Sequence, residues 1–444
     1  MYIKLAQRSF IMKKIIALIL AIVLILSLCG CNNTTEIISD VISDEVIIEH
    51  QQVYYDENGN VISKPENSTS SSQEGSSNVN STVSDNNSTT SENNTNYIDY
   101  NTVVEVDICD DIIRGYLDAT TPERQFSWLN EYSGQRLDNQ VLELEWQFDG
   151  STIYTVTFSE SADFSNPYTV QCSYMSIKNA ALIPGKTYYW KTTGTWSDKV
   201  LGGGKIHVKD APVRWITIDG VGNVRDMGGW KAAGGKKVKY GMLYRGRKLE
   251  DVKDTGLATI KQLGFKTELD IRYENQKFQT PGTGMNYEFI NSPGQYDSVI
   301  KGNPEVFKAS YKRVFELLAD KNNYPFYAHC NAGADRTGTY AFIVNGVLGV
   351  SYEDLTRDFE LTSFSESGKR WRGTGAGNTF TENDLVMQED ENNTVAWGRL
   401  HKKMMEYAKE NGCTTLQESI EYWLTSYIGV PKEHIDSFRS IVLE

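Results

Sequence analysis

Residues 324–342, YPFYAHCNAGADRTGTYAF, place two apolar runs on either side of a very short turn of small and polar residues. The first run is typical of a buried strand, and the second, RTGTYAFIVNGVLGV, is typical of a helix packed against it. Other segments repeat this alternation: LATIKQLGF and NPEVFKASYKRVFELLAD carry apolar residues at helical spacing, and TELDI is strand-like. Alternating strands and helices predict an α/β domain with a mainly parallel central sheet.

Local signals mark where two of these helices end or begin. Gly264 follows LATIKQLGF and is suited to end that helix, because glycine readily adopts the left-handed conformation. Ser351 together with Asp354 predicts the capped start of a further helix.

The turn between the strand and the helix encloses only residues 331–335. A turn this short directs several backbone N–H groups into one concavity, and together with the helix N-terminus it forms an anion site of phosphate size. The same field favours a thiolate at Cys330, which makes this residue a nucleophile at neutral pH. Gly333 gives the turn the backbone freedom it needs, and Gly338 allows close packing of the helix on the strand. Ligands of open α/β sheets bind beyond the carboxyl ends of the strands, where Cys330 falls.

The residues after the turn complete a phosphate site. Arg336 lies six positions after the cysteine and has a planar fork of donors that matches two phosphoryl oxygens. Thr337 can donate its hydroxyl to the Cys330 sulfur and stabilise it as a leaving group. His329 is expected to hydrogen-bond loop carbonyls and to support the thiolate without acting as a base. The predicted phosphate-binding residues are Asn331, Ala332, Gly333, Ala334 and Arg336.

The arrangement His-Cys-x5-Arg-Thr resembles the signature of the protein-tyrosine-phosphatase superfamily. The form HCNAGADRTG is similar to the branch of bacterial secreted tyrosine and lipid phosphatases, in which an Asp precedes the Arg. The likeness continues in three further segments, GVGNVRDMGGW (220–230), GMLYRGRKL (241–249) and LDIRYENQ (269–276). It covers about residues 213–365, and the C-terminal helices match only loosely. The resemblance implies Cys330 as the nucleophile, Arg336 as the phosphate clamp and Asp335 as the general acid, with no cofactor.

Several residues of these segments have more than one interpretation. Asp270 is a second acid in the cleft, an orienter of Arg336 or a structural partner of Arg272. The NVRD stretch 223–226 is expected to hold the first turn of the domain together, with substrate contact as the alternative. Basic residues concentrate in 225–248, where they either steer anionic substrates or form a solvated face.

The residue before the loop acid bears on the substrate. Family relatives that act on phosphoinositides tend to carry Lys at the position that is Ala334 here. We therefore expect phosphotyrosine as the substrate, with phosphoinositides or inositol polyphosphates as the alternative. A non-catalytic surface binding protein is the alternative from another class.

The N-terminus resembles a bacterial lipoprotein signal. Two lysines precede the apolar run 15–28, which is too short to span a membrane comfortably but suits a signal peptide. The run closes on LCGC, which resembles a lipobox in which Cys31 becomes the lipidated N-terminus. A simple membrane anchor and an ordinary signal peptide are the alternatives. This interpretation places the protein outside the cytoplasm, on the cell membrane of a bacterium.

Charge and cysteine usage exclude several classes of partner. Removing residues 1–30, which carry four basic residues and no acid, takes the net charge from −14 to −18. Such an acidic chain is not expected to bind nucleic acid. The cysteines show no CxxC pair and no zinc-site spacing, so no metal is predicted. A disulfide between Cys109 and Cys172 is possible but is not indicated by the spacing.

Between the signal and the phosphatase-like part, two further regions are expected. Residues 65–96 contain no Lys, Arg or aromatic residue, so 32–97 is predicted to be a disordered linker. Residues 98–210 are strand-like: LELEWQF (142–148) alternates, and Asp149-Gly150 followed by TIYTVTF (152–158) predicts a hairpin.

The stretch LIPGKTYYWKT resembles the late strand of fibronectin-type-III domains, where a tyrosine locks the corner. We therefore expect an all-β sandwich, fibronectin-III-like, with an unclassified β-module as the alternative. No ligand or partner of this module is predicted.

The sequence as a whole predicts four parts. They are a lipoprotein signal peptide (1–31), a linker (32–97), the β-sandwich (98–210) and a cysteine-dependent α/β phosphatase domain (211–444). The expected function is that of an exported, lipid-anchored phosphomonoesterase with a phosphocysteine intermediate. Its expected partners are a phosphorylated protein, peptide or small phosphoester and, through the anchor, the membrane.

Overall fold

The computed structural model describes residues 97–137, 141–178, 181–196, 198–211, 213–291, 294–301, 304–372 and 396–444, together with short strands at 54–55, 61–62 and 375–376. The chain divides into two units, residues 1–91 and 92–444. In the first unit, β1 (Tyr54–Tyr55) pairs antiparallel with β2 (Val61–Ile62). The predicted signal peptide, Cys31 and the stretch 65–96 lie outside the described residues. No helix in the described part of the chain is long and apolar enough to cross a membrane.

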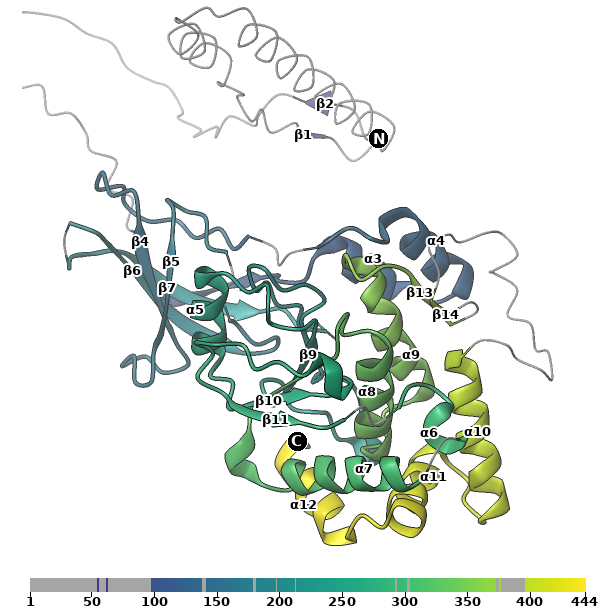
Figure 1. Ribbon diagram of the computed structural model, residues 1–444. Coiled ribbons are helices and arrows are strands. Elements are labelled where there is room, and N and C mark those ends of the chain that lie inside the picture. Colours follow the sequence, from purple (N-terminus) through teal and green to yellow (C-terminus); the bar gives the residue numbers. More distant parts are fainter. Residues whose placement is uncertain are drawn as a thin grey trace, which may run out of the picture. The chain divides into compact units, whose positions relative to one another are not determined.

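A five-stranded, mainly parallel sheet forms the centre of the C-terminal part (Figure 1). Its order is β11 (Asn286–Phe289), β10 (Thr267–Asp270), β12 (Phe326–His329), β9 (Leu243–Gly246) and β8 (Arg225–Asp226). β10 runs parallel to β11 and β12, and β12 runs parallel to β9, whereas β8 is antiparallel to β9. The predicted α/β fold with a mainly parallel sheet is confirmed.

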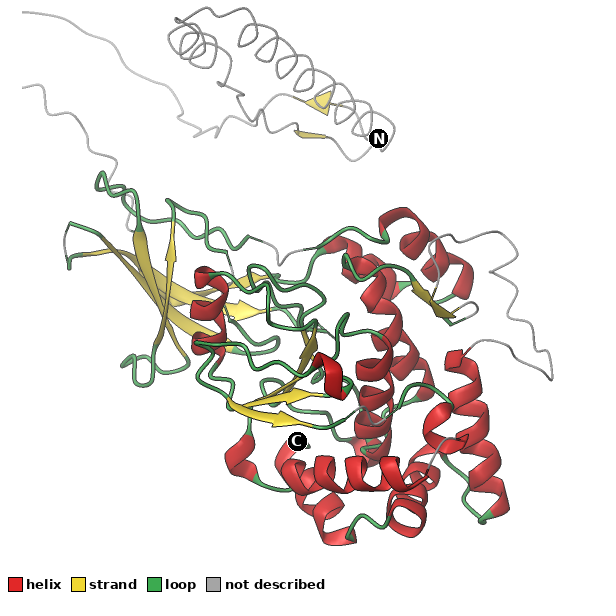
Figure 2. Ribbon diagram, viewed as in Figure 1, coloured by secondary structure: helices red, strands yellow, loops and turns green. Residues whose placement is uncertain are grey.

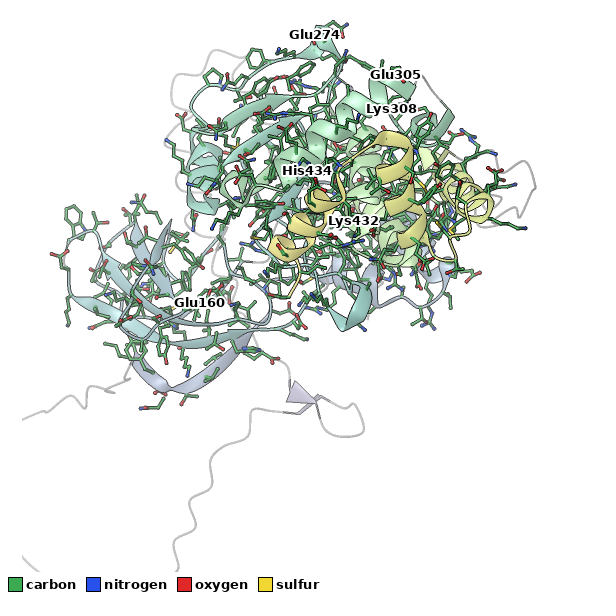
Figure 3. The ribbon with its side chains drawn as sticks, turned by 90° about the horizontal axis from the view of Figure 1, so that it is seen from below. Glu160, Glu274, Glu305, Lys308, Lys432 and His434 are labelled. Carbon is green, nitrogen blue, oxygen red and sulfur yellow. The ribbon has the colours of Figure 1, made fainter. Side chains whose placement is uncertain are left out.

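Helices of this part follow the strands in the chain. They are α5 (Asp254–Leu263), α6 (Ser298–Lys301), α7 (Pro304–Leu318), α8 (Asp335–Val347), α9 (Tyr352–Glu360), α10 (Ala396–Glu410), α11 (Leu416–Tyr422) and α12 (Lys432–Val442), with a π-helix at Trp423–Ile428. A two-stranded ribbon joins β13 (Arg370–Trp371) to β14 (Gly375–Ala376). Figure 3 shows Glu305 and Lys308 on α7, whose side chains form an ion pair of 3.2 Å.

Both faces of the central sheet are covered, because side chains alternate between the faces along each strand. Leu243, Phe326 and Ala328 belong to the large hydrophobic core that includes α7 and α8. Tyr244 and Tyr327 point into the smaller core on the α5 side. The strand that leads to the cysteine is therefore held from both sides.

Helix α8 is the best-buried helix of the domain and carries the expected site. Residues 336–347 are all buried, which explains why this stretch reads as a nearly continuous apolar run. Other predicted boundaries are confirmed. Gly264 ends α5 with a φ of +68°, and the Ser351 hydroxyl accepts the Asp354 N–H at 3.1 Å at the start of α9.

The β-rich region contains one five-stranded sheet in its described residues (Figure 2). Its order is β3 (Ile98–Val106), β7 (Val200–Val208), β6 (Thr187–Gly194), β4 (Tyr154–Ser159) and β5 (Tyr168–Cys172). The Tyr188 hydroxyl accepts the backbone N–H of Ile183 at 3.1 Å, which is the kind of corner contact that the sequence suggested. The fibronectin-III-like assignment of this sheet stays a prediction.

The predicted hairpin of 142–148 with 152–158 is wrong. β4 pairs with β5 on one side and β6 on the other, so neither edge is free for a further strand. Residues 142–148 form no strand. Leu142 forms a bridge with Ile177, the Gln147 N–H donates to the Leu201 carbonyl of β7 at 2.9 Å, and the buried side chains of Leu144 and Trp146 pack in the core of the sheet. The alternating pattern reflects this burial and not strand pairing.

The expectation that 98–210 is all-β is also wrong in part. It contains α3 (Asp111–Asp118) and α4 (Pro122–Tyr132), whose apolar residues join the same core as the phosphatase-like sheet. The Phe126 and Trp371 rings meet edge to face at 5.3 Å, and the Tyr116 hydroxyl donates to Glu360 at 2.6 Å. The core of the C-terminal part therefore extends across the predicted boundary at residue 210.

The possible disulfide is not formed. Cys109 lies buried just before α3, in the core of the phosphatase-like part, whereas Cys172 is half-buried at the end of β5, and both are free thiols. Burial raises the pKa of the Cys109 thiol to about 12 and that of Cys172 to about 11. Both thiols are therefore protonated at neutral pH.

Candidate active site

The predicted turn connects β12 to α8 and begins with Cys330, which is 3% exposed. The backbone N–H groups of residues 331–336 donate to no acceptor in the described part of the chain. They are the first turn of α8 and the turn before it, so they converge near the positive end of the helix dipole. Such a set of free N–H groups beside a cysteine is suited to bind three oxygens of a phosphoryl group.

The carbonyl groups of the same turn are all engaged, which fixes the direction of the N–H groups. The Asn331 oxygen accepts the Lys248 N–H at 3.3 Å, and the Ala332 oxygen accepts from Ser367 at 2.8 Å and Asn223 at 3.0 Å. The Gly333 oxygen accepts from the Arg245 guanidinium at 2.8 Å. Because each carbonyl is held from outside, the peptide planes present their N–H edges to the concavity.

A buried charge cluster stands behind the turn. Asp358 on α9 accepts from Arg225 Nε at 2.8 Å and from Arg245 Nη1 at 2.5 Å. Arg225 also donates to Asn223 Oδ1 at 2.5 Å, and both arginine side chains are fully buried. Burial raises the pKa of Asp358, but the two guanidinium charges outweigh it and leave the pKa below its usual value. The NVRD stretch therefore contacts the phosphate-binding turn directly through Asn223 and indirectly through Asp358 and Arg245, a role that was not predicted from the sequence.

Gly333 is required by both conformation and space. Its φ is +66°, in the left-handed region, and a Cβ there would lie 2.2 Å from the carbonyl oxygen of Gly246. Gly338 is less constrained, since a Cβ would meet the Phe359 ring at 3.2 Å. The predicted roles of both glycines agree with their surroundings.

Arg336 is positioned with most of its donors free. Its guanidinium carbon lies 4.7 Å from the centre of the Tyr273 ring, and Nη1 donates to Gln276 Oε1 at 3.2 Å. Within the described residues it forms no ion pair, although it is only 8% exposed. A buried guanidinium without a carboxylate partner is the counter-charge that a phosphoryl dianion needs.

Asp335 is held by groups that the sequence did not indicate. Arg370 donates to both carboxylate oxygens, at 2.8 and 3.0 Å, and the Tyr296 hydroxyl also donates to Oδ1. Burial raises the pKa of Asp335, but the hydrogen bonds and the charge of Arg370 outweigh it, so the pKa is below that of an ordinary carboxyl. The expected general acid is therefore a well-stabilised carboxylate in this structure.

Asp270 has the structural surroundings that were one of its three interpretations. Its fully buried carboxylate accepts from Arg272 at 2.8 and 2.9 Å and from the Tyr287 hydroxyl at 2.7 Å. Burial raises its pKa, but Arg272, His329 and Tyr287 together bring it below the usual value. This geometry favours the Arg272 partner over a second acid, and among the described residues Arg336 forms no hydrogen bond or ion pair with Asp270.

His329 contacts a loop carbonyl as predicted, whereas Thr337 does not form its predicted hydrogen bond. His329 Nδ1 lies 3.2 Å from the Cys330 carbonyl oxygen, as predicted, and Nε2 lies 3.1 Å from the buried Glu268 carboxylate. Thr337 is fully buried, yet its hydroxyl has no hydrogen-bond partner in the described structure, so the expected bond to the Cys330 sulfur is not formed.

Ala334 is fully buried, and its bearing on the substrate stays a prediction. The basic residues of 225–248 meet neither of the two expectations. The basic residues do not form one surface: two are the buried partners of Asp358, Arg247 pairs with Glu366 at 2.9 Å, and Lys248 pairs with Glu250. The segment therefore is neither a single solvated face nor one steering patch.

A cavity of about 680 Å³ adjoins the site. Its wall includes Tyr273, which stacks on Arg336, and Tyr296, which donates to Asp335. Val306 and Phe307 of α7 add apolar surface, and Arg399 is paired with Asp297 at 3.2 Å. The cavity therefore has a mixed lining, in which Tyr273 and Tyr296 are the residues that contact Arg336 and Asp335. Among the described residues no cluster of His, Cys, Asp or Glu could hold a metal ion.

Comparison with known proteins identifies a family whose profile covers the turn after β12. The profile of the tyrosine phosphatase family matches residues 216–444, more than half of the chain. The chain belongs to this family. The matched range includes the central sheet, the turn after β12 and all helices from α5 to α12.

Individual relatives are distant. A candidate tyrosine-protein phosphatase of Cupriavidus necator is 25% identical over 178 residues, covering 35% of this chain and 63% of that protein. A candidate tyrosine-protein phosphatase of Meyerozyma guilliermondii is 30% identical over 119 residues, covering 26% and 57%. The chain thus spans about three fifths of the length of these relatives. The core catalytic domain of the PP-IP phosphatase SIW14 from S. cerevisiae, solved with citrate, is 13% identical with a TM-score of 0.23, covering 38% of this chain and 88% of that domain.

Proposed function

We propose that this member of the tyrosine phosphatase family hydrolyses phosphomonoesters through a phosphocysteine intermediate. The observation that carries the proposal is the turn after β12, with its carbonyls held outward, its N–H groups free and Cys330 at its start. Arg336 adds a guanidinium that forms no ion pair with any described residue. Membership of the family supports the same reaction class.

In the first step the Cys330 thiolate attacks phosphorus, the S–P bond forms, and the bond from phosphorus to the ester oxygen breaks. The ester oxygen leaves with the electron pair and takes up a proton, for which Asp335 is the proposed donor. In the second step water attacks the phosphocysteine, Asp335 accepts its proton, and the thiolate is released. The turn amides and Arg336 hold the equatorial oxygens throughout. No cofactor takes part.

The proposed substrate is a phosphotyrosine side chain of a protein or peptide, or a small aryl phosphoester. Support comes from the aromatic residues near Arg336: Tyr273, which is 49% exposed, stacks on its guanidinium, and Tyr296 and Phe307 line the adjoining cavity. An aromatic ring buries a large area against such groups. Phosphoinositides and inositol polyphosphates are the alternative, and a substrate panel decides between them.

We further propose that the chain is exported and lipid-anchored through Cys31, as its N-terminal sequence resembles a bacterial lipoprotein signal. The β-rich sheet preceding the catalytic part would then be a fibronectin-III-like module between the anchor and the enzyme. The Tyr188 corner contact supports this likeness.

The test is a comparison of the full chain with Cys330→Ser and with Cys413→Ser, a half-buried free cysteine that is matched in chemistry. Free phosphate release is measured on phosphotyrosine peptide, a phosphoinositide and an inositol polyphosphate. Cys330→Ser should lose almost all turnover but still bind phosphate, because a serine hydroxyl is not ionised at neutral pH. Retention of a tenth of the activity in Cys330→Ser would refute the covalent mechanism. Absence of turnover in the parent chain would favour the non-catalytic binding protein.

A further inference from the structure

The side chain of Asp335 is bound more tightly than a proton donor needs to be. Arg370 grips both carboxylate oxygens, at 2.8 and 3.0 Å, and the Tyr296 hydroxyl occupies another acceptor position. Arg336, the next residue on α8, adds a second positive charge nearby. These three groups face the carboxylate from β13, from the segment before α6 and from α8 itself.

Arg370 is itself fixed in place. Its backbone N–H donates to the Ser363 hydroxyl at 2.8 Å, and that hydroxyl donates to the Arg370 carbonyl at 2.9 Å. Its Nη1 donates to the Lys369 carbonyl at 2.8 Å, and the side chain is only 10% exposed. The pair with Asp335 is therefore a built feature of the site and not a loose surface contact.

In this environment only a small fraction of Asp335 carries a proton at neutral pH. Each of its bonds from Arg370 and Tyr296 is made to the ionised form, and a neutral carboxyl would have to turn its O–H toward a donor. The ionised form suits the second step, where the attacking water must lose a proton. It does not suit the first step with a poor leaving group, such as a phenol of unactivated tyrosine.

We propose that Arg370 is a positioning residue that holds Asp335 as a carboxylate and thereby sets which leaving groups the enzyme can expel. This inference rests on the proposed phosphatase function. With the ion pair closed, the leaving oxygen takes its proton from the small protonated fraction of Asp335 or from solvent. In the second step the carboxylate accepts the proton of water and returns it to solvent. Activated esters, whose oxygen leaves without a proton, are not limited by the pair.

The test measures kcat/KM against pH for the parent, Arg370→Met and Arg370→Lys. Phosphotyrosine peptide serves as the poor leaving group and an activated aryl phosphate as the good one. An arginine partner lowers an aspartate pKa by about 1–3 units. In the plot of kcat/KM against pH for the peptide, the basic limb is the part where activity falls as the pH rises, and Arg370→Met should move this limb up by about one pH unit. Because the protonated fraction changes tenfold per unit, peptide turnover at pH 7 should rise about tenfold. The kcat/KM for the activated ester should change little. Titration of the substrate phosphoryl group affects all variants equally, so it cancels when they are compared.

Two controls separate this role from a structural one. Arg372→Met, two residues along, removes the Glu360 partner and disturbs the same segment without touching Asp335. It should not move the limb. In Asp335→Asn/Arg370→Met the gain on the peptide should disappear. If Arg370→Met is unstable by thermal unfolding, Arg370→Lys, which keeps the charge but loses the two-point grip, should give a smaller shift in the same direction.

Equal losses on both substrates with an unmoved limb would overturn the proposal and leave Arg370 a purely structural residue. A gain that persists in the double variant would also overturn it, because the proton would then come from elsewhere. Failure of the proposed function is a different result. It would appear as a lack of Cys330-dependent turnover in the parent chain.

Discussion

Asp358 provides the sharpest test of how the phosphate-binding turn is held. Its carboxylate bridges Arg225 and Arg245, at 2.8 and 2.5 Å, and all three side chains are at most 5% exposed. Arg245 also donates a hydrogen bond to the Gly333 carbonyl at 2.8 Å. Asp358→Asn keeps the shape of the side chain but replaces the shared counter-charge with a neutral amide. Two guanidinium groups would then remain buried with no anion between them.

The expected magnitude follows from the burial. Removing one partner of a buried ion pair costs about 3–5 kcal/mol, because the remaining charge is left uncompensated. Burial and the charge of Arg245 already lower the pKa of Arg225 to about 10, although Asp358 opposes this shift. We therefore expect Asp358→Asn to lose about 3–5 kcal/mol of unfolding free energy at pH 7. Glu353→Gln is the matched control on the same helix, since its pair with Arg357 is 62% exposed on the acid side and should be worth about 0–1 kcal/mol.

The assay is urea unfolding followed by tryptophan fluorescence, repeated from pH 7 to pH 3. Since the folded pKa of Asp358 is below its usual value, the stability it contributes is present above the unfolded pKa of about 3.9 and is lost as pH falls through the lower folded value. The difference between parent and Asp358→Asn should therefore shrink as the pH falls below about 4.

Activity of the folded variant is a second measure. Without Asp358, Arg245 no longer holds the turn carbonyls in place. The backbone N–H groups of the turn would then be misplaced, which should lower kcat/KM by roughly 10–100-fold. A loss of unfolding free energy below about 1 kcal/mol in Asp358→Asn, similar to that of the Glu353→Gln control, would refute the reasoning. So would full activity in a variant that has lost the expected stability, because the turn would then not depend on the cluster.

Three further predictions concern the turn, the cavity and the anchor. Gly333→Ala should abolish phosphate-dependent thermal stabilisation, because a Cβ would lie 2.2 Å from a carbonyl oxygen at a φ of +66°; retained stabilisation by phosphate would contradict this. Phe307→Ala should raise KM for phosphotyrosine peptide about 5–100-fold with little change in kcat, as steady-state kinetics will show, and an unchanged KM would mean that the ring does not enter the cavity. Cys31→Ala should release the chain from the membrane fraction or leave it with an uncleaved signal, and firm attachment after signal removal would exclude lipidation.

Local signals predicted the part of the site that the chain forms with near neighbours. The strand ending at Cys330, the turn with Gly333 and the helix beginning at Asp335 follow one another, so periodicity and glycine placement were enough. The partners of that turn are a different matter. Arg370 meets Asp335 from 35 residues away, and nothing in its own surroundings in the sequence marks it as a partner.

The missed helices had signals that were available. Asp110 and Thr121 cap α3 and α4 with their side chains, and Pro122 occupies the first turn of α4. The strand-like segments around them favoured an all-β interpretation, although caps of this kind predict helices. Burial of Ala334 could not have been predicted, since it depends on contacts with segments distant in the sequence, such as β9, whose Arg245 donates to the Ala334 carbonyl at 3.3 Å.

The arrangement of cations leads to a final prediction on substrate preference. Arg247 follows the Gly246 carbonyl that lies against Gly333, so it is close to the rim of the turn, but it is paired with Glu366 at 2.9 Å. A second phosphate on a substrate would have to displace that carboxylate, whereas an aromatic ring meets Tyr273 without opening an ion pair. A part-exposed pair is worth about 0–1 kcal/mol, so the preference against polyphosphates should be only a few-fold from this source. Glu366→Gln should therefore raise kcat/KM for an inositol polyphosphate about two- to fivefold relative to phosphotyrosine peptide. A ratio that stays constant would mean that Arg247 does not reach the substrate, and that discrimination comes from the aromatic cavity alone.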